Sequence, residues 1–311
     1  MKKRWITIFL GGLLGLFMLS LAVLSLFPGF VLSLAVEADR TAAGLEERTV
    51  QVAEHRIQYL SGGSGEPLVL LHGFAANKDN WTRVAAYLTP HFRVIAPDLP
   101  GFGESSRDAQ ARYAVADQVE RLHAFARALG LAQFHLGGNS MGGWIAGAYA
   151  AGYPHQVQSL WLLAPGGVAS AQASELAQHL ARGENPLLVN RPEDFDTMFD
   201  FAAVTRPWIP GPIKRYLAQQ AIRQRDFNAK VVRELAETPL SLEPLLQDHP
   251  VPALIVWGEQ DRILHVSGAA ILAGLMPNAQ AVVMPHTGHI PMIERPRETA
   301  ERFLRFQHID F

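Results

Sequence analysis

The chain alternates between short, continuous apolar runs and longer stretches in which apolar positions recur every three or four residues. The continuous runs have the length of strands and lie at 68–71, 92–96, 134–136, 157–163, 253–257 and 281–284, with two more short strands expected around Glu54-His55 within 49–60. Helical spacing lies at 79–88, 114–129, 141–151 and 294–306. Strands that are apolar at successive positions are buried on both faces. This order therefore predicts an α/β fold, a mostly parallel sheet with helices on both faces.

One long segment interrupts this alternation. From 169 to 247 the strand patterns stop, and the sequence is helical and rich in charged residues. We interpret residues 169–247 as a helical cap, or lid, inserted into a core formed by 47–168 and 248–311. The apolar positions of the cap, such as Phe195, Met198 and Phe199, are interpreted as internal packing, so no substrate-binding residue is predicted there.

The amino-terminal region is apolar on every side. No charged residue occurs from Trp5 to Phe27, and a helix of this length would span roughly 35 Å, enough to cross a hydrocarbon core of about 30 Å. We predict a transmembrane helix at 5–27, after a cytoplasmic segment 1–4 and before a juxtamembrane segment 28–46. The three cations within 1–4 favour a cytoplasmic amino terminus, which would place the rest of the chain outside.

Two features of this region leave alternatives open. A cleaved signal peptide normally has an apolar region of about 7–15 residues, shorter than this one, although Val36-Glu37-Ala38 has small residues where a signal peptidase cuts. Gly11 and Gly15 have the spacing that lets two membrane helices approach closely, which gives the hypothesis of a homodimer through this helix. Glycine is also common in membrane helices that do not associate.

Composition narrows the classes of partner and chemistry. The net charge is −2 and no block of Lys or Arg follows residue 4, so no nucleic-acid partner is predicted. The chain has no cysteine, which excludes disulfides, a thiol nucleophile and cysteine-based metal sites. Because the histidines are scattered and the acidic residues lack the spacing of a calcium loop, neither a metal nor a cofactor is predicted.

The most specific motif is Gly-Asn-Ser-Met-Gly at 138–142, between an apolar strand and a helical pattern. It matches Gly-x-Ser-x-Gly in the context that marks a nucleophilic serine. A serine that projects from a sharp strand-to-helix turn needs strained backbone, and flanking glycines remove side chains that would collide. The alternative is an ordinary strand-to-helix turn, so the prediction of Ser140 as nucleophile depends on its partners.

Loops after two later strands supply these partners. Asp261, in the run Trp-Gly-Glu-Gln-Asp, is the predicted carboxylate that orients a histidine, with Glu259 as the alternative because it lies closer to the strand end. His289 would take the proton of Ser140 and return it to the leaving group. His286 is the competing histidine, but the glycine before His289 and the proline shortly after it favour His289. The chain order Ser, Asp, His is the order expected for this motif.

The run Leu-Leu-His-Gly-Phe at 70–74 ends the first deeply apolar strand and completes the predicted site. We predict that the backbone N–H groups of Phe74 and Met141 stabilise the oxyanion of a tetrahedral intermediate. Losing one such donor typically costs about 3–4 kcal/mol of transition-state stabilisation. His72 is predicted to be structural rather than a proton-transfer group.

These motifs resemble the α/β-hydrolase superfamily over residues 47–311. The loop Asp98–Ser105 is similar to the loop after the fourth core strand of that superfamily, and the run 72–81 is similar to bacterial lipases typified by cold-adapted enzymes. With its amino-terminal segment, the chain resembles membrane-anchored bacterial lipases and phospholipases A. This resemblance implies a single-pass protein of the inner membrane that faces the periplasm, cleaves acyl esters of phospholipids, lysophospholipids or glycerides, and shapes its acyl pocket with the cap.

Three hypotheses for function follow. The first is ester hydrolysis through an acyl-enzyme on Ser140. The second is a small-molecule carboxylesterase or a carbon–carbon bond hydrolase of the same fold, since Gly-Asn-Ser-Met-Gly-Gly is also similar to enzymes that cleave ring-fission products. The run Ala75–Lys78 favours the lipases, because the ring-fission enzymes usually have glycine and proline there. The third is a tethered binding protein without catalysis.

Overall fold

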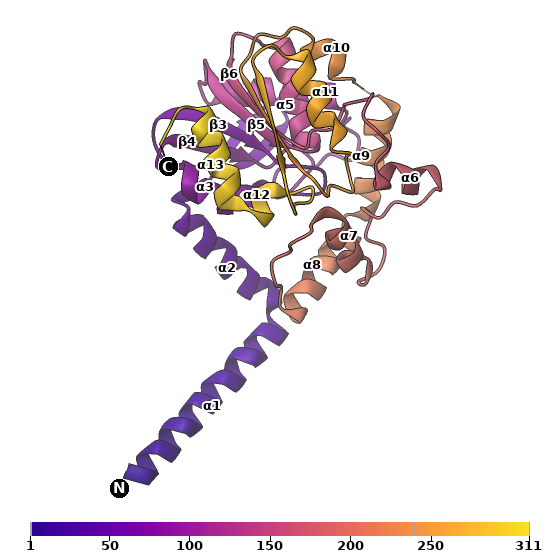
Figure 1. Ribbon diagram of the computed structural model, residues 1–311. Coiled ribbons are helices and arrows are strands. Elements are labelled where there is room, and N and C mark those ends of the chain that lie inside the picture. The colour runs from indigo at the N-terminus through magenta and orange to yellow at the C-terminus, as the bar shows by residue number, and fades with distance from the viewer. Residues whose placement is uncertain (1, 239, 311) are drawn as a thin grey trace.

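The computed structural model describes residues 2–238 and 240–310, with the side chains of the first helix described only in part. The described residues form one eight-stranded sheet from β1 (Leu45–Val52), β2 (His55–Gly62), β3 (Glu66–Leu71), β4 (Phe92–Pro97), β5 (Phe134–Asn139), β6 (Val157–Leu163), β7 (Ala253–Gly258) and β8 (Ala279–Met284). The strand order is β1-β2-β4-β3-β5-β6-β7-β8 (Figure 1). The pairs β1–β2 and β2–β4 are antiparallel, and the other pairs are parallel.

Helices cover both faces of the sheet. One face packs against α4 (Val115–Ala128), α5 (Met141–Gly152) and α11 (Ser267–Leu275), and the other packs against α3 (Thr82–Leu88) and α13 (Pro296–Phe306). In β6, Leu160 and Leu162 join the first layer, whereas Trp161 and Leu163 join the second. All four side chains are fully buried, which explains why the strand lacks alternating polar positions.

The predicted elements occur with shifted ends. The strand predicted at 157–163 is confirmed without change, but the strands predicted within 49–60 begin earlier, because β1 starts at Leu45. The helix predicted at 79–88 begins as the short helix η1 (Lys78–Trp81). The helix predicted at 294–306 is two helices, α12 (Pro291–Glu294) and α13, since Pro296 has no N–H to continue the first and favours the start of the second. Helix α11 was not predicted.

Between β6 and β7 the chain is helical, as the sequence predicts for 169–247. The segment contains α6 (Glu175–Ala181), α7 (Asp194–Ala202), α8 (Gly211–Arg223), α9 (Arg225–Glu237) and α10 (Glu243–Leu246), and none of the eight strands. Helices α7 and α8 extend from the domain toward the amino-terminal helices (Figure 1). Helix α10 instead joins the core, because Leu246 packs with the residues of α5.

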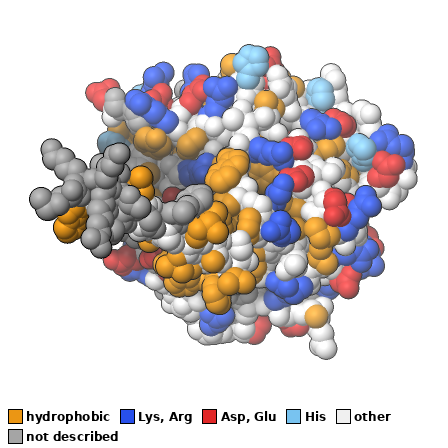
Figure 2. All heavy atoms as spheres, turned by 90° about the horizontal axis from the view of Figure 1, so that it is seen from below, with side chains coloured by type: hydrophobic (Ala, Val, Ile, Leu, Met, Phe, Trp, Pro, Cys, Tyr) orange, Lys and Arg blue, Asp and Glu red, His pale blue; other side chains and the backbone are white. Residues whose placement is uncertain are grey.

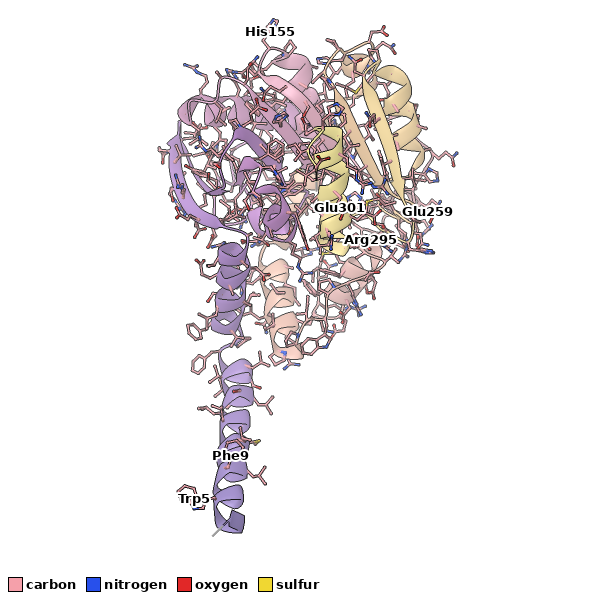
Figure 3. The ribbon with its side chains drawn as sticks, turned by 60° about the vertical axis from the view of Figure 1, so that its left-hand side comes forward. Trp5, Phe9, His155, Glu259, Arg295 and Glu301 are labelled. Atoms are coloured by element: carbon pink, nitrogen blue, oxygen red, sulfur yellow. The ribbon has the colours of Figure 1, made fainter. Side chains whose placement is uncertain are left out.

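The amino-terminal helices are α1 (Lys2–Leu26) and α2 (Pro28–Ala42). Helix α1 stands away from the domain (Figure 1), and Figure 3 shows Trp5 and Phe9 projecting from it. Among the residues searched, which are those described, no helix taken alone has the length and apolarity to cross a membrane. The pair Met18–Leu26 and Pro28–Ala42, bent by 99°, meets those criteria together. Met1 lies outside the described residues, as do the side chains of residues 2–4 and Gly11.

Candidate active site

The predicted nucleophile lies on a strained turn between β5 and α5. Ser140 has φ 57° and ψ −118°, a conformation that costs a residue with a side chain about 1–3 kcal/mol. Both flanking glycines are needed there. A Cβ on Gly138 would lie 2.3 Å from the carbonyl oxygen of Gly142, and a Cβ on Gly142 would lie 2.2 Å from that of Leu71. The turn is fixed because Ser140 N–H donates to Leu163 O over 3.0 Å.

The parallel strands bring the predicted site residues to one edge of the sheet. Strands β3, β5, β7 and β8 all end there, and the register pairs Leu71 with Gly138 and Gly258 with Met284. The loops that follow these strand ends carry the predicted oxyanion, serine, carboxylate and histidine positions. This edge is where parallel α/β sheets usually bind their ligands.

His289 and Asp261 form a buried pair at this edge. The distance from His289 Nδ1 to Asp261 Oδ2 is 2.7 Å, and Asp261 Oδ1 accepts hydrogen bonds from the N–H groups of Ile263 and Leu264. The carboxylate is therefore fixed on the Nδ1 side, which leaves Nε2 for a reacting group. The alternative carboxylate, Glu259, lies at the surface (Figure 3) and accepts a weak bond from the backbone of His286.

Ser140 and His289 are linked through the residue between strand and turn. Asn139 Nδ2 donates to the backbone oxygen of His289 over 2.9 Å and to Leu163 O over 3.1 Å. No side-chain hydrogen bond between Ser140 and His289 is found within residues 2–238 and 240–310. Catalytic hydrogen bonds often form only when substrate binds, so the lack of this bond is compatible with the roles predicted for the pair.

The loop after β3 has the features expected of an oxyanion loop. In the described part of the chain, the N–H groups of Phe74 and Met141 donate to no other group. A Cβ on Gly73 would lie 3.2 Å from Cβ of Ser140, so this loop passes close to the nucleophile. His72 is fully buried and uses both ring nitrogens: Nδ1 donates to Gly73 O over 2.7 Å, and Nε2 accepts from Leu99 N–H over 3.0 Å. Burial lowers the pKa of His72, and its role in the loop is structural, as the sequence predicts.

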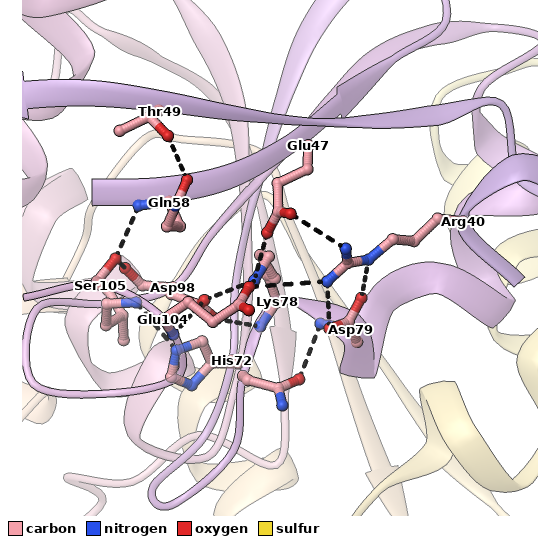
Figure 4. A network of polar contacts seen from close by, with 12 residues as sticks. Arg40, Glu47, Thr49, Gln58, His72, Lys78, Asp79, Asp98, Glu104 and Ser105 are labelled. Atoms are coloured by element: carbon pink, nitrogen blue, oxygen red, sulfur yellow. Dashed lines mark hydrogen bonds and ion pairs between the residues drawn. The ribbon is translucent and has the colours of Figure 1, made fainter. Parts of the chain in front are cut away.

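A buried network of charges holds this loop from behind (Figure 4). Asp98 is fully buried and accepts from both the backbone N–H of Lys78, over 2.7 Å, and its ammonium group, over 2.8 Å. The same ammonium group contacts Glu47 over 3.0 Å and also Glu104. Burial alone would lower the pKa of Lys78, but these carboxylates raise it overall, so the lysine stays charged.

Helix α2 is fastened to the same network. Arg40 makes a two-pronged ion pair with Asp79, with distances of 2.7 and 2.9 Å, and also contacts Glu47 over 3.3 Å. The hydrogen bonds to Asp79 raise the pKa of Arg40. Helix α2 is therefore connected to the segment that follows the loop after β3.

Comparisons with known proteins identify the family of the chain. A family model described as the alpha/beta hydrolase fold matches residues 66–207 and 209–296. The chain belongs to the α/β-hydrolase family. Lipase 1 of Psychrobacter immobilis is 37% identical over 279 residues, 88% of each chain, and the monoacylglycerol lipase ABHD6 of Homo sapiens is 32% identical over 86% of this chain and 83% of its own. The crystal structure of a membrane phospholipase A, described as a bacterial virulence factor, is 45% identical with a TM-score of 0.89, covering 97% of this chain and 98% of that one.

Sequence reasoning missed a carboxylate of this α/β-hydrolase that joins the cap to the histidine loop. Glu294 Oε1 accepts from Gly288 N–H over 2.9 Å, while Oε2 accepts from the N–H groups of Val204 and Thr205 over 2.8 and 2.9 Å. His289 N–H itself donates to Ala202 O over 2.8 Å. Burial raises the pKa of Glu294 above its ordinary value. Nothing in the local sequence distinguishes Glu294 from a surface glutamate.

Between the oxyanion loop and the cap the hydrolase has a cavity of about 190 Å³. The amides of Gln220, Gln224 and Asn228 line it together with six apolar side chains of the cap. These six are Leu187, Val189, Phe195, Met198, Leu217 and Ala221. The interpretation of Phe195 and Met198 as internal packing is therefore incomplete, because both also face this space. Ala75, Ala76 and Asn77 form the opposite wall, so the cavity begins next to the predicted oxyanion donor.

Proposed function

We propose that this protein is a membrane-anchored serine hydrolase that cleaves fatty-acyl esters of phospholipids, lysophospholipids or glycerides through an acyl-enzyme on Ser140. The observation that carries the proposal is the buried His289–Asp261 hydrogen bond of 2.7 Å, at the sheet edge that also carries the strained Ser140. The proposed domains are the core, 47–168 and 248–311, and the cap, 169–247.

Acylation begins with attack of Ser140 Oγ on the ester carbonyl carbon. His289 Nε2 accepts the serine proton, and Asp261 stabilises the imidazolium that forms. The carbonyl oxygen becomes negatively charged and accepts hydrogen bonds from the N–H groups of Phe74 and Met141. When the carbon–oxygen bond to the alcohol breaks, His289 returns the proton to the leaving oxygen, which leaves the acyl group on Ser140.

Deacylation repeats these steps with water. His289 takes a proton from the water molecule, whose oxygen attacks the acyl carbon and forms a second oxyanion. The bond to Ser140 Oγ then breaks, His289 protonates the serine, and the fatty acid leaves. No group outside the chain other than ester and water is required.

Two observations support long acyl chains as substrates. The cavity beside Ala75 is lined by six apolar side chains from the cap and by four amide side chains, and the apolar part suits a hydrocarbon chain. Relatives that match most of the chain are named lipases, and a structural neighbour is named a membrane phospholipase A.

The proposed anchor is the apolar segment 5–27. The cations within 1–4 would stay in the cytoplasm, so the catalytic domain would face the periplasm from the bacterial inner membrane. An anchor confines the enzyme beside its lipid substrate and raises its effective concentration there. Association of two copies through Gly11 and Gly15 is a further prediction, tested by the oligomeric state of full-length protein in detergent.

The test of function is a matched panel of substrates in detergent micelles. Short- and long-chain synthetic esters, monoacylglycerol, lysophospholipid and diacyl phospholipid are compared for the wild type and for Ser140→Ala. We expect fatty acid to be released from the lipids by the wild type, with turnover falling by about 10⁶-fold in the variant. Turnover restricted to short esters or ring-fission diketones would replace the proposal with a small-molecule hydrolase. If a fluorophosphonate fails to label Ser140 and no ester turns over, a non-catalytic binding protein is the remaining explanation.

A further inference from the structure

Helix α2 presents a row of apolar side chains to the outside. Phe27, Phe30 and Leu34 recur at intervals of three and four residues and are all exposed, whereas Arg40 on the same helix is buried against the core. Such spacing places Phe30 and Leu34 on one face of the helix, and Phe27 is the exposed residue directly before it. Because α2 is bent by 99° from α1, it lies close to the membrane plane when α1 stands along the membrane normal. An amphipathic helix in this orientation is suited to the interface between headgroups and acyl chains.

The cap contributes a second exposed apolar element. The loop 204–210, between α7 and α8, carries Trp208, whose side chain is 85% exposed, more than any other large hydrophobic side chain in the described part of the chain. Pro207 and Pro210 restrict the backbone on both sides of Trp208. A stiff, projecting indole is costly in water, and tryptophan is the residue enriched at membrane interfaces.

The two elements lie at the same end of the molecule. Helix α8 begins at Gly211 and contacts both α1 and α2. The ring of Tyr216 in α8 packs against Gly29 of α2. A Cβ on Gly29 would lie 2.8 Å from Cζ of this ring, so the absence of a side chain allows this contact. Trp208 precedes Gly211 by three residues, so its backbone lies within about 11 Å of the start of α8. Figure 2, seen from the side on which α1 departs, shows hydrophobic side chains gathered beside that helix, with both basic and acidic side chains around them.

The charges beside these residues suit a membrane surface. From 204 to 216 the chain has three cations, Arg206, Lys214 and Arg215, and no carboxylate. Arg206 is paired with Asp196 and Asp200, and Lys214 is paired with Asp196, while Arg215 is exposed. An exposed cation beside apolar side chains can approach the phosphate of a lipid headgroup.

We propose that Phe27, at the junction of α1 and α2, and Phe30 and Leu34 of α2, together with the loop 204–210, form one interfacial face that rests in the headgroup layer of the membrane. This proposal rests on the proposed anchoring by segment 5–27. Trp5 and Trp208 then lie near opposite surfaces of the bilayer, separated by α1, whose 25 residues span about 37 Å.

The interfacial face is directly connected to the catalytic histidine loop. Val204 and Thr205, at the start of the loop, donate to Glu294, and Glu294 also accepts from Gly288 next to His289. Contact with lipid therefore holds the end of the loop that shares hydrogen bonds with the histidine loop. We expect substrates in a bilayer to depend on this face, and dissolved short esters to be independent of it.

The absence of cysteine from the chain makes a direct test straightforward. Three full-length single-cysteine variants are labelled with a fluorophore: Trp208→Cys in the interfacial face, Phe9→Cys in the anchor, and His155→Cys, which lies at the far end of the domain (Figure 3). Each is reconstituted into vesicles of phosphatidylcholine and phosphatidylglycerol that contain nitroxide-labelled lipids. We expect the lipids to quench the labels at positions 208 and 9, and to leave the label at 155 unquenched.

The three labels separate failure of the face from failure of the anchor. Quenching at 9 without quenching at 208 overturns the interfacial face and leaves the anchor standing. Lack of quenching at both positions overturns the anchor, and the face with it. The label at 208 could instead escape quenching by lipid and become more protected from solvent as the amount of protein per vesicle rises. That result identifies a second copy of the chain as the partner and also overturns the proposal.

Turnover provides an independent test. Trp208→Ser is compared with Leu180→Ser, a control that removes an exposed apolar side chain from α6, away from the interfacial face. We expect Trp208→Ser to lower hydrolysis of phospholipid in vesicles by about fivefold and to leave a dissolved short ester unchanged, because membrane binding scales with buried apolar area. The control should change neither. An equal loss on both substrates would place the effect in the active site and contradict the proposal.

Discussion

Ser140 and the loop after β3 are held by the core of the domain, whereas the proposed acid–base pair, Asp261 and His289, is held partly by the cap. On the serine side the contacts are close backbone packing around Gly142 and the buried Lys78–Asp98 pair behind the loop. On the histidine side, His289 N–H donates to Ala202 O at the end of α7. The contacts on the serine side lie within the core, whereas the contact on the histidine side joins the core to the cap.

The carboxylate loop is tied to the cap in the same way. Arg262, next to Asp261, makes a two-pronged ion pair with Glu175 of α6, with both distances 2.6 Å. The carbonyl oxygen of Arg262 also accepts from Leu176 N–H over 3.0 Å. A displacement of the cap would therefore move Asp261 and His289 relative to Ser140. The comparison teaches that the cap is positioned to influence the proton transfer proposed for Asp261 and His289.

The largest expected effect concerns the choice of carboxylate on the histidine side. Asp261→Asn should lower kcat by about 10⁴-fold, because an amide can no longer hold the histidine with its proton on Nδ1. The matched control is Glu259→Gln, two residues earlier and at the surface, which should stay within about twofold of the wild type. Both are measured as steady-state turnover of one soluble ester. A large loss in Glu259→Gln with little change in Asp261→Asn would reverse the assignment.

The next effect concerns stability on the serine side. Lys78→Met removes the cation between Asp98, Glu47 and Glu104 and leaves a fully buried carboxylate without its partner. Breaking a buried pair in this way typically costs about 3–5 kcal/mol of the free energy of unfolding. Lys214→Met removes a half-exposed lysine paired with Asp196 and should cost less than about 1 kcal/mol. Denaturant unfolding of both proteins in detergent measures the difference, and equal losses would show that the network does not stabilise the loop.

The sequence predicted the serine side better than the contacts that hold the site together. Glycine spacing around Ser140 and the apolar run before it are local signals, so the β5–α5 turn could be read directly. The structure also brings Asp261 and His289 together, as their positions after two parallel strands suggest. The catalytic roles of these residues stay predictions until the variants are measured.

The supporting contacts could not be read from the sequence because they join distant positions. Asn139 reaches a residue 150 positions away, and Glu294 reaches Val204 across 90. The sequence predicts no role for Arg40 within the segment 28–46, because its partner Asp79 lies 39 residues further along the chain. Neither periodicity nor motif spacing carries this information, which depends on how the finished sheet places its loops.

The smallest effect isolates the link between cap and histidine. Glu294→Gln keeps the size of the side chain but replaces one of its two accepting oxygens with an NH2 donor, so the hydrogen bonds from Gly288 and from Val204 and Thr205 cannot all be kept. A buried N–H left without its acceptor costs about 1–3 kcal/mol, so kcat/KM at neutral pH should fall by at least roughly fivefold. Glu294 touches no reacting atom, and we assign it a positioning role.

The pH dependence distinguishes this role from a simple loss of folding. Because burial raises the pKa of Glu294, its ionisation is less favourable in the folded protein than in the unfolded chain. The wild type should therefore lose stability relative to Glu294→Gln as pH rises from the ordinary glutamate pKa through the raised one. Over the same interval the kcat/KM of the wild type, divided by that of the variant, should increase, since only the ionised carboxylate makes the stronger hydrogen bonds. Opposite trends in stability and activity would establish that Glu294 positions the histidine loop, whereas a constant activity ratio across this interval would assign it to the fold alone.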